Sequence, residues 1–243
     1  MDLTLIGIGS GTPGHLTRDA EAAIADADLF LIPHKGAEKS DLADLRVALL
    51  DRLRPDAVTA FFDMPERDAS LPYLQAVDRW HDAIADLWAA RIAEHPGADR
   101  VALLVWGDPS LYDSTLRIAA RLTPAPKVRV IPGLTSLQLL TAAHAIPLNG
   151  LGAPVVITTG RRLTDHGWPE NADRVAVMLD GGCAFQSLPP EGTRIWWGAY
   201  LGMDEEILDA GPLSEAGPRI IATRAEARAA HGWIMDTYLL ARD

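Results

Sequence analysis

Histidine, tyrosine and carboxylate side chains stand where the chain turns after apolar segments, and such groups can donate or accept protons in catalysis. His34 follows the apolar segment Leu29–Ile32, and Tyr112 and Asp113 follow the segment Val101–Trp106. We therefore take Tyr112, Asp113 and His34 as candidates for proton transfer. Each has a structural alternative: Tyr112 could serve packing, His34 could belong to a turn, and Asp113 could cap a helix.

A glycine-rich loop, Gly7–Thr17, joins the first apolar segment to a helical pattern. Glycines after a strand let the main chain adopt positive φ and approach a ligand closely. Gly9, Gly11 and Gly14 also satisfy the dinucleotide pattern G-x-G-x-x-G. That motif needs an acidic residue about 20 residues on, at the end of the second strand. The nearest acid, Asp28, stands at the start of that strand, which disfavours a dinucleotide and leaves a tight turn as the other alternative.

A second loop, residues 106–115, reads Trp-Gly-Asp-Pro-Ser-Leu-Tyr-Asp-Ser-Thr and follows a very hydrophobic segment. Asp108 before Pro109 suits a helix N-cap with proline in the first turn, which is the structural interpretation. That interpretation does not require Tyr112, Ser114 and Thr115 as well. These residues place polar atoms at the carboxyl end of a strand, where open α/β sheets bind ligands.

A third loop, residues 130–136, reads Val-Ile-Pro-Gly-Leu-Thr-Ser and has the same organisation. An apolar segment meets a Pro-Gly turn, and the hydroxyl residues Thr135 and Ser136 follow. Either hydroxyl could cap the next helix, and a capping hydroxyl can also face a ligand.

The elements that must position these loops alternate between short apolar and longer amphipathic segments. The predicted strands of the first part are Leu3–Ile8, Leu29–Ile32, Ala57–Phe62, Val101–Trp106 and Val128–Ile131. The predicted helices are Asp19–Ala27, Asp41–Leu53, Leu74–Glu94 and Thr115–Leu122. Nearly continuous apolar strands favour a largely parallel sheet that is covered on both faces. We expect the three loops to converge at the carboxyl ends of its strands.

The segment Ile146–Pro154 contains two prolines and two glycines, and this composition is typical of a linker between helical and strand patterns. Strand patterns resume beyond it at Val155–Thr159, Val175–Leu179, Arg194–Trp197, Ile207–Leu213, Arg219–Thr223 and Trp233–Leu240. We predict an α/β protein with two lobes, residues 1–148 and 154–243, a linker at 149–153, and an active site in the cleft between the lobes.

The composition restricts the class of protein. Of the 243 residues, 48% are hydrophobic and 23% charged, as in soluble globular proteins. Lys and Arg number 22 against 33 Asp and Glu, and a net charge of −11 disfavours nucleic acid as a partner. No apolar run approaches the ~20 residues that span a bilayer. With no leader pattern and a single cysteine, Cys183, we expect a cytoplasmic protein without disulfide or metal.

The three loops, in this order and spacing, resemble the tetrapyrrole (corrin/porphyrin) methylase family. That family opens with a strand and a Gly-x-Gly-x-Gly loop running to Leu-Thr, followed by a Gly-Asp-Pro loop and a Pro-Gly-x-[ST]-[SA] motif. The segment Ala142–Pro147 is similar to the family's short alanine-rich helix that ends in Ile-Pro-Leu. The resemblance covers most of the chain.

The resemblance implies a class III methyltransferase that uses S-adenosylmethionine, yields S-adenosylhomocysteine and needs no metal. It also implies a tetrapyrrole substrate and a homodimer. The residues expected at the methionine end of the cofactor are Gly107, Asp108, Pro109, Leu111, Thr135 and Ser136. Those expected around its adenosine are Leu179, Asp180, Ala199 and Tyr200. Those expected to face the tetrapyrrole are Gly7, Gly9, Ser10 and Gly11.

Within the family, the segments 33–36, 177–181 and 196–202 are similar to a subgroup of corrin biosynthesis. That subgroup methylates ring carbon C-1 of a precorrin and releases the extruded two-carbon unit as acetate. Corrin precursors carry many carboxylates, so an acidic chain needs a local basic site, and we expect Lys35 and Arg161 to meet them. A C-11 or C-17 corrin methylase, a methylase of another substrate and a non-catalytic regulatory homologue stay open as alternatives.

The chain departs from the family pattern at two places. The usual Gly-Pro-Gly-Asp-Pro is Gly9–Pro13 here, with serine and threonine in place of proline and aspartate. The usual Phe-Gly-Arg after Gly-Asp-Pro is replaced by Tyr112, Asp113 and Ser114. Both changes touch the substrate side, which fits a distinct substrate and leaves the individual roles there open.

Overall fold

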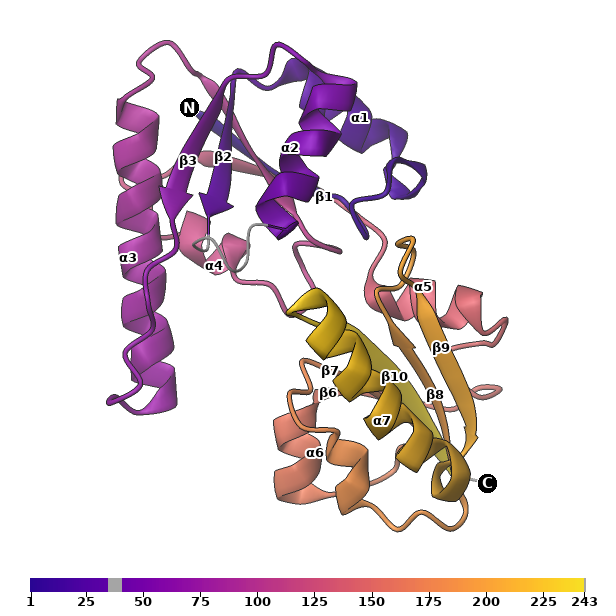
Figure 1. The fold of residues 1–243 in the computed structure, drawn as a ribbon. Coiled ribbons are helices and arrows are strands. Elements are labelled where there is room, and N and C mark those ends of the chain that lie inside the picture. Colours follow the sequence, from indigo (N-terminus) through magenta and orange to yellow (C-terminus); the bar gives the residue numbers. More distant parts are fainter. Residues whose placement is uncertain (35–40, 243) are drawn as a thin grey trace. The chain divides into compact units, whose positions relative to one another are not determined.

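The computed structural model describes residues 1–34 and 41–242 and shows an α/β protein, as the sequence predicts (Figure 1). Contacts divide the chain into two compact units, Met1–Thr135 and Ser136–Asp243. This division comes before the predicted linker at 149–153 because helix α5 (Ser136–Ala143) packs against strands of the second sheet. Leu140 of this helix is fully buried.

The first unit contains a five-stranded sheet of order β3-β2-β4-β1-β5, in which every recorded pairing is parallel. Its strands are β1 (Asp2–Gly7), β2 (Leu29–His34), β3 (Thr59–Asp63), β4 (Arg100–Val105) and β5 (Lys127–Ile131). Its helices are α1 (Arg18–Asp26), α2 (Asp41–Leu53), α3 (Tyr73–Ala93) and α4 (Thr115–Ala119), with a 3-10 turn η1 (Pro13–His15). The predicted parallel sheet is confirmed.

Side chains of the first sheet alternate between two cores, because successive residues of a strand point to opposite faces. Leu103 and Val105 of β4 join the core under α3 and α4. Ala102 and Leu104 join the core under α1 and α2. Both faces are therefore covered, and the polar loops are confined to the ends of the strands.

The second unit contains a five-stranded mixed sheet of order β6-β7-β10-β8-β9. Its strands are β6 (Val155–Thr159), β7 (Arg174–Met178), β8 (Thr193–Ala199), β9 (Ile207–Pro212) and β10 (Asp236–Arg242). Besides α5 it contains α6 (Gly160–His166), the 3-10 turn η3 (Ala184–Ser187) and α7 (Leu213–His231). Only β6 and β7 pair in parallel; the remaining pairs are antiparallel.

One predicted strand of the second unit was wrong. The segment Arg219–Thr223 lies within helix α7, and Pro218 stands inside that helix. Its β-branched residues and the preceding proline indicate a break and a strand when read locally. Burial of Ala216, Ile220 and Ala227 on one side of the helix overrides that local preference.

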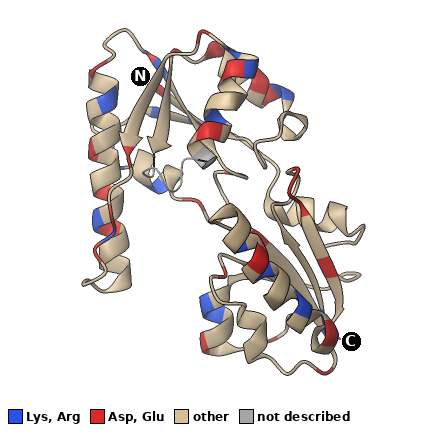
Figure 2. Ribbon diagram, in the orientation of Figure 1, with Lys and Arg blue, Asp and Glu red and all other residues tan. Residues whose placement is uncertain are grey.

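Charged residues lie mainly on the helices and loops of both units (Figure 2). Strands β1, β4, β7 and β10 carry charged residues only at their ends. In the described part of the chain, no helix combines the length and the apolar character needed to cross a bilayer.

Candidate functional site

Three loops of the first unit meet at the carboxyl ends of β1, β4 and β5. The Gly9 N–H donates to the Gly107 carbonyl (3.2 Å) and the Gly107 N–H to the Gly9 carbonyl (2.8 Å). A β-carbon on Gly133 would lie 2.2 Å from the Gly107 oxygen, and one on Gly7 would lie 2.6 Å from the Gly133 nitrogen. Only glycine permits main chains to approach so closely. The predicted convergence of the three loops is confirmed.

Asp108 ties the second loop to the third. Its carboxylate accepts hydrogen bonds from the Gly133 N–H (2.9 Å) and the Ser110 N–H (2.8 Å), and also from the Ser110 hydroxyl. Burial opposes ionisation of this carboxyl, but the hydrogen bonds from Ser110 and Gly133 outweigh it and lower its pKa below 3.8. Helix α4 begins only at Thr115, so Asp108 joins loops rather than capping a helix.

The glycine-rich loop closes on itself. Gly9 and Gly11 have φ of +59° and +78°, and the Gly11 N–H donates to the Ile8 carbonyl at 2.9 Å. The Ser10 side chain is buried, where its hydroxyl donates to the Thr12 hydroxyl (3.0 Å) and lies 2.8 Å from His15 Nδ1. Ser10 therefore faces the inside of the loop, which leaves mainly main-chain atoms for a ligand.

Tyr112 and Asp113 stand between this junction and α4. Tyr112 is 43% exposed and has φ of +50°, a conformation that non-glycine residues adopt rarely and often at functional sites. Asp113 accepts hydrogen bonds from the N–H (2.7 Å) and the hydroxyl of Thr115, the first residue of α4. The helix-start interpretation of Asp113 is thus supported, whereas Tyr112 is left partly exposed to solvent.

The third proton-transfer candidate, His34, ends β2. Its Nδ1 lies 3.3 Å from the carboxylate of Asp63, which ends the neighbouring strand β3. Both side chains are exposed, so an acidic partner orients this imidazole in water. Lys35, predicted to bind a substrate carboxylate, lies outside the described residues.

Arg46 was not among the predicted site residues. This half-buried side chain extends from α2, and its Nε donates to the Leu104 carbonyl of β4 at 2.8 Å. Burial lowers its pKa to about 10 although the charge of Asp113 opposes that change, so it stays cationic at neutral pH. The only local signal was an arginine in the middle of an amphipathic helix. That signal does not single the residue out, because an ordinary surface position explains it equally well.

The expected adenosine contacts of the second unit differ in accessibility. Leu179 follows β7 with φ of +52° and is 66% exposed. The Asp180 carboxylate is buried and accepts from the N–H groups of Gly182 (2.9 Å) and Ala184 (2.6 Å) and from the Tyr238 hydroxyl (2.6 Å). Asp180 therefore shapes its own loop, while Leu179 is the residue whose side chain faces solvent.

Ala199 ends β8 and Tyr200 follows it directly, and both side chains are buried in the core of the second unit. The Tyr200 hydroxyl donates to the Trp233 carbonyl at 2.6 Å, and burial raises its pKa. Ligand contacts at these two positions would involve main-chain atoms. Arg161 lies exposed on α6, and Ser136 is the first residue of α5.

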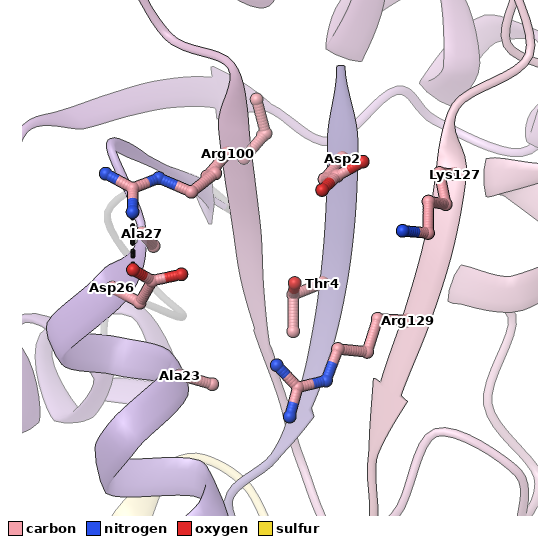
Figure 3. Close-up of a pocket in the computed structure, with 9 residues that line it drawn as sticks. Asp2, Thr4, Ala23, Asp26, Ala27, Arg100, Lys127 and Arg129 are labelled. Atoms are coloured by element: carbon pink, nitrogen blue, oxygen red, sulfur yellow. Dashed lines mark hydrogen bonds and ion pairs between the residues drawn. The ribbon is translucent and has the colours of Figure 1, made fainter.

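A separate cavity of about 190 Å³ lies among Asp2, Thr4, Arg100, Lys127 and Arg129 (Figure 3). These residues come from the amino-terminal parts of β1, β4 and β5, whereas the three loops follow the carboxyl ends. The cavity is therefore distinct from the candidate site. Among the described residues, no three His, Cys, Asp or Glu side chains gather closely enough to hold a metal ion.

The chain is similar in sequence and in structure to known proteins. The model of the tetrapyrrole (corrin/porphyrin) methylases matches residues 2–217. A precorrin-6A synthase [deacetylating] from Sinorhizobium sp is 47% identical over 98% of this chain and 94% of that protein. A solved protein described as cobalamin synthesis related (CobF), from Corynebacterium diphtheriae, is 39% identical with a TM-score of 0.85, covering 99% of this chain and 98% of that one.

More distant solved structures share the fold alone. The uroporphyrin-III C-methyl transferase from Thermus thermophilus, complexed with S-adenosylhomocysteine, is 19% identical with a TM-score of 0.61, covering 99% of this chain and 97% of that one. Because the family model spans most of the sequence and two relatives match it almost from end to end, this chain belongs to the tetrapyrrole (corrin/porphyrin) methylases.

Proposed function

We propose that this chain is an S-adenosylmethionine-dependent C-methyltransferase of cobalamin biosynthesis that converts precorrin-5 to precorrin-6A. The transfer is to ring carbon C-1 and is accompanied by release of acetate. The observation that carries this proposal is the 47% identity, over nearly all of both chains, to a precorrin-6A synthase [deacetylating]. The converging loops of the first unit support it, because they form the main-chain junction that the family motifs predict.

The residues present suit S-adenosylmethionine. The sulfonium supplies a methyl group that is already activated, so the protein has to align the donor and acceptor, which can contribute ~7–11 kcal/mol. Around Gly107 and Asp108, main-chain groups at the ends of parallel strands could hold the polar methionine end. Leu179 presents an exposed apolar surface that suits the flat face of adenine.

Release of acetate places a further demand on the chain. Water must add to an acetyl carbonyl, and the bond from that carbon to the ring must then break with its electron pair left on the ring. The ring carbon so formed is a nucleophile for the methyl group. The carbonyl needs a hydrogen-bond donor and the water needs a base.

Tyr112, Asp113 and His34 would share these tasks. We assign the donor role to Tyr112, because this partly exposed residue lies in the loop that follows β4 and carries a hydroxyl that can donate. Asp113 would orient this segment through Thr115, since its carboxylate already accepts two hydrogen bonds there. His34, oriented by Asp63, is the candidate base for the water. Lys35 and Arg161 would bind carboxylates of the corrin precursor, and main-chain atoms of Gly7, Gly9, Ser10 and Gly11 would face its ring.

The enzyme would act in the cytoplasm, as the composition predicts, and as a homodimer, as the family resemblance implies. Sedimentation velocity of the purified protein tests the oligomeric state, with a mass of twice 26.2 kDa expected.

The deciding experiment is mass spectrometry of the product formed from precorrin-5 and S-adenosylmethionine with a labelled methyl group. Gain of one labelled methyl group together with an equivalent of acetate supports the proposal. Methyl gain without acetate would point to a methylase of a different specificity. Binding of S-adenosylhomocysteine without any turnover would point to a regulatory homologue.

A further inference from the structure

A buried ion pair lies in the second unit, between Arg224 of α7 and Asp236 at the start of β10. Arg224 Nε lies 2.9 Å from Asp236 Oδ2, and only 11% and 6% of the two side chains are exposed. The Trp197 indole N–H also donates to Asp236 Oδ2 at 2.9 Å. Burial opposes the charge on Arg224, but the hydrogen bond to Asp236 outweighs it and raises the pKa of the guanidinium.

Such a pair calls for a reason other than stability. Apolar residues of similar volume often stabilise a core as well as a buried ion pair does, because both charges must leave water. Arg224 also makes a contact outside this pair. Its Nη2 donates at 2.8 Å to the main-chain carbonyl of Asp180, in the loop that follows β7.

This loop, residues 179–184, requires external support. Leu179 and Cys183 both have left-handed main chains, with φ of +52° and +56°. Each such conformation of a non-glycine residue costs about 1–3 kcal/mol. The contact from Arg224 is one support, and the hydrogen bonds accepted by the Asp180 carboxylate are others.

The first residue of helix α6, Gly160, packs directly against this loop. A β-carbon on Gly160 would lie 2.4 Å from Cγ of Asp180, so glycine is needed there for the carboxylate to fit. The loop is therefore fixed from three sides, yet Leu179 at its start is left 66% exposed. A strained, rigid loop that presents an apolar side chain to solvent is typical of a preformed ligand contact.

We infer that Arg224, held in place by Asp236, is a positioning residue that fixes the 179–184 loop for binding of the cofactor's adenosine. This inference rests on the proposed function, since it takes S-adenosylmethionine as the ligand of that loop. Arg224 itself touches no ligand; it acts through the Asp180 carbonyl. Its effect should therefore fall on cofactor affinity and leave the transfer step intact once cofactor is saturating.

The test compares three variants. Arg224→Met combined with Asp236→Asn removes the contact to the carbonyl without leaving an unpaired buried charge. Arg224→Lys retains a cation that can donate to one acceptor but not to both in the same geometry. Arg219→Met is the matched control, because Arg219 of the same helix forms an exposed ion pair with Asp209, at 2.6 Å. Thermal melts establish that each variant is folded.

S-adenosylhomocysteine is titrated into each protein by calorimetry, and kcat and KM for S-adenosylmethionine are measured. The double variant should bind S-adenosylhomocysteine about tenfold more weakly or worse, since a hydrogen bond from a charged donor is lost. Its KM for S-adenosylmethionine should rise likewise, with kcat within about twofold of wild type. Arg224→Lys should be intermediate, and Arg219→Met unchanged.

The possible outcomes distinguish a failure of this inference from a failure of the proposed function. Wild-type affinity in the folded double variant refutes the inference and leaves the proposed function standing. A fall in kcat without a rise in KM also refutes it, because it indicates general damage to the fold. Absence of any binding to the wild-type protein overturns the proposed function and the inference together.

Discussion

Substitution of Gly133 by alanine tests the junction on which the first unit's site depends. A β-carbon there would lie 2.2 Å from the Gly107 oxygen, 2.7 Å from the Gly7 carbonyl carbon and 2.9 Å from the Gly7 Cα. All three atoms belong to the main chain, so no side chain can rotate away. The φ of Gly133 does not lie in the left-handed region, and the effect is therefore one of contact alone.

The loss in unfolding free energy depends on which parts of the chain must move to accept the added carbon. Insertion of one carbon into a packed site typically costs about 1–3 kcal/mol. Here relief requires separation of the loops after β1, β4 and β5, and it strains the 2.9 Å hydrogen bond from the Gly133 N–H to Asp108. We expect a loss near the upper end, about 3 kcal/mol. For a chain of this size that corresponds to a fall in Tm of roughly 6–12 °C.

Urea denaturation and S-adenosylhomocysteine titration measure the two consequences, lower stability and weaker binding. The control is Gly14→Ala in the neighbouring loop, because a β-carbon on Gly14 would have no heavy atom within 4 Å. We expect Gly14→Ala to match the wild type in both assays. If Gly133→Ala unfolds at the wild-type urea concentration and binds with wild-type affinity, the three loops do not meet as described.

Three further predictions concern single side chains. Asp108→Asn replaces one of two acceptor oxygens by a donor that faces an N–H, and should cost about 1–3 kcal/mol at neutral pH. Because the pKa of Asp108 is lowered in the folded protein, its stabilisation is present above the unfolded value and is lost as pH falls through the folded value. The stabilities of variant and wild type should therefore begin to converge as pH falls below about 4 in urea melts at stepped pH; a constant gap would contradict this. Leu179→Gly relieves the left-handed φ at a largely exposed position, so unfolding free energy should stay unchanged or rise by up to about 1 kcal/mol, whereas S-adenosylhomocysteine affinity should fall about tenfold. A destabilised Leu179→Gly would show instead that the side chain serves packing. Arg161→Glu should raise the KM for precorrin-5 several-fold without changing cofactor affinity, and Arg162→Glu on the same exposed turn is its control. An equal effect of both substitutions would show that Arg161 contributes only to the overall positive charge and makes no specific contact with the substrate.

The sequence predicted the first unit well because its signals are local and agree with one another. Apolar strands followed by glycine loops imply a parallel sheet, and the carboxyl ends of parallel strands meet at one edge. Gly9, Gly107 and Gly133 could therefore be expected together, as the structure shows. The segment Arg219–Thr223 failed because burial along α7 decides its conformation, and that burial depends on residues far away in the chain.

Side-chain direction at the site was beyond the sequence for the same reason. Motif resemblance placed Asp180 at the cofactor, but nothing local indicates that Gly182, Ala184 and Tyr238 occupy its carboxylate. Arg224, 44 residues further along, carries no motif at all, and only the fold brings it to the Asp180 carbonyl. Contacts that join distant segments are set by packing, which a single sequence does not display.

The two units hold their expected cofactor loops by the same local device. In each, a residue with positive φ precedes a buried aspartate, Gly107 before Asp108 and Leu179 before Asp180. Each aspartate accepts the N–H of the residue two positions on, at 2.8 Å in the first loop and 2.9 Å in the second.

The difference between the loops lies in the left-handed residue. At 107 glycine adopts the conformation without strain, and a β-carbon would have only the Leu134 oxygen within reach, at 3.9 Å. At 179 leucine occupies the same conformation at a cost of about 1–3 kcal/mol, although glycine would avoid it. Since this side chain is mostly exposed, it returns little of that cost through packing in the unliganded protein. Contact with a bound ligand would offset the strain of this exposed leucine. Cofactor binding should therefore be most sensitive to a single side chain in the 179–184 loop.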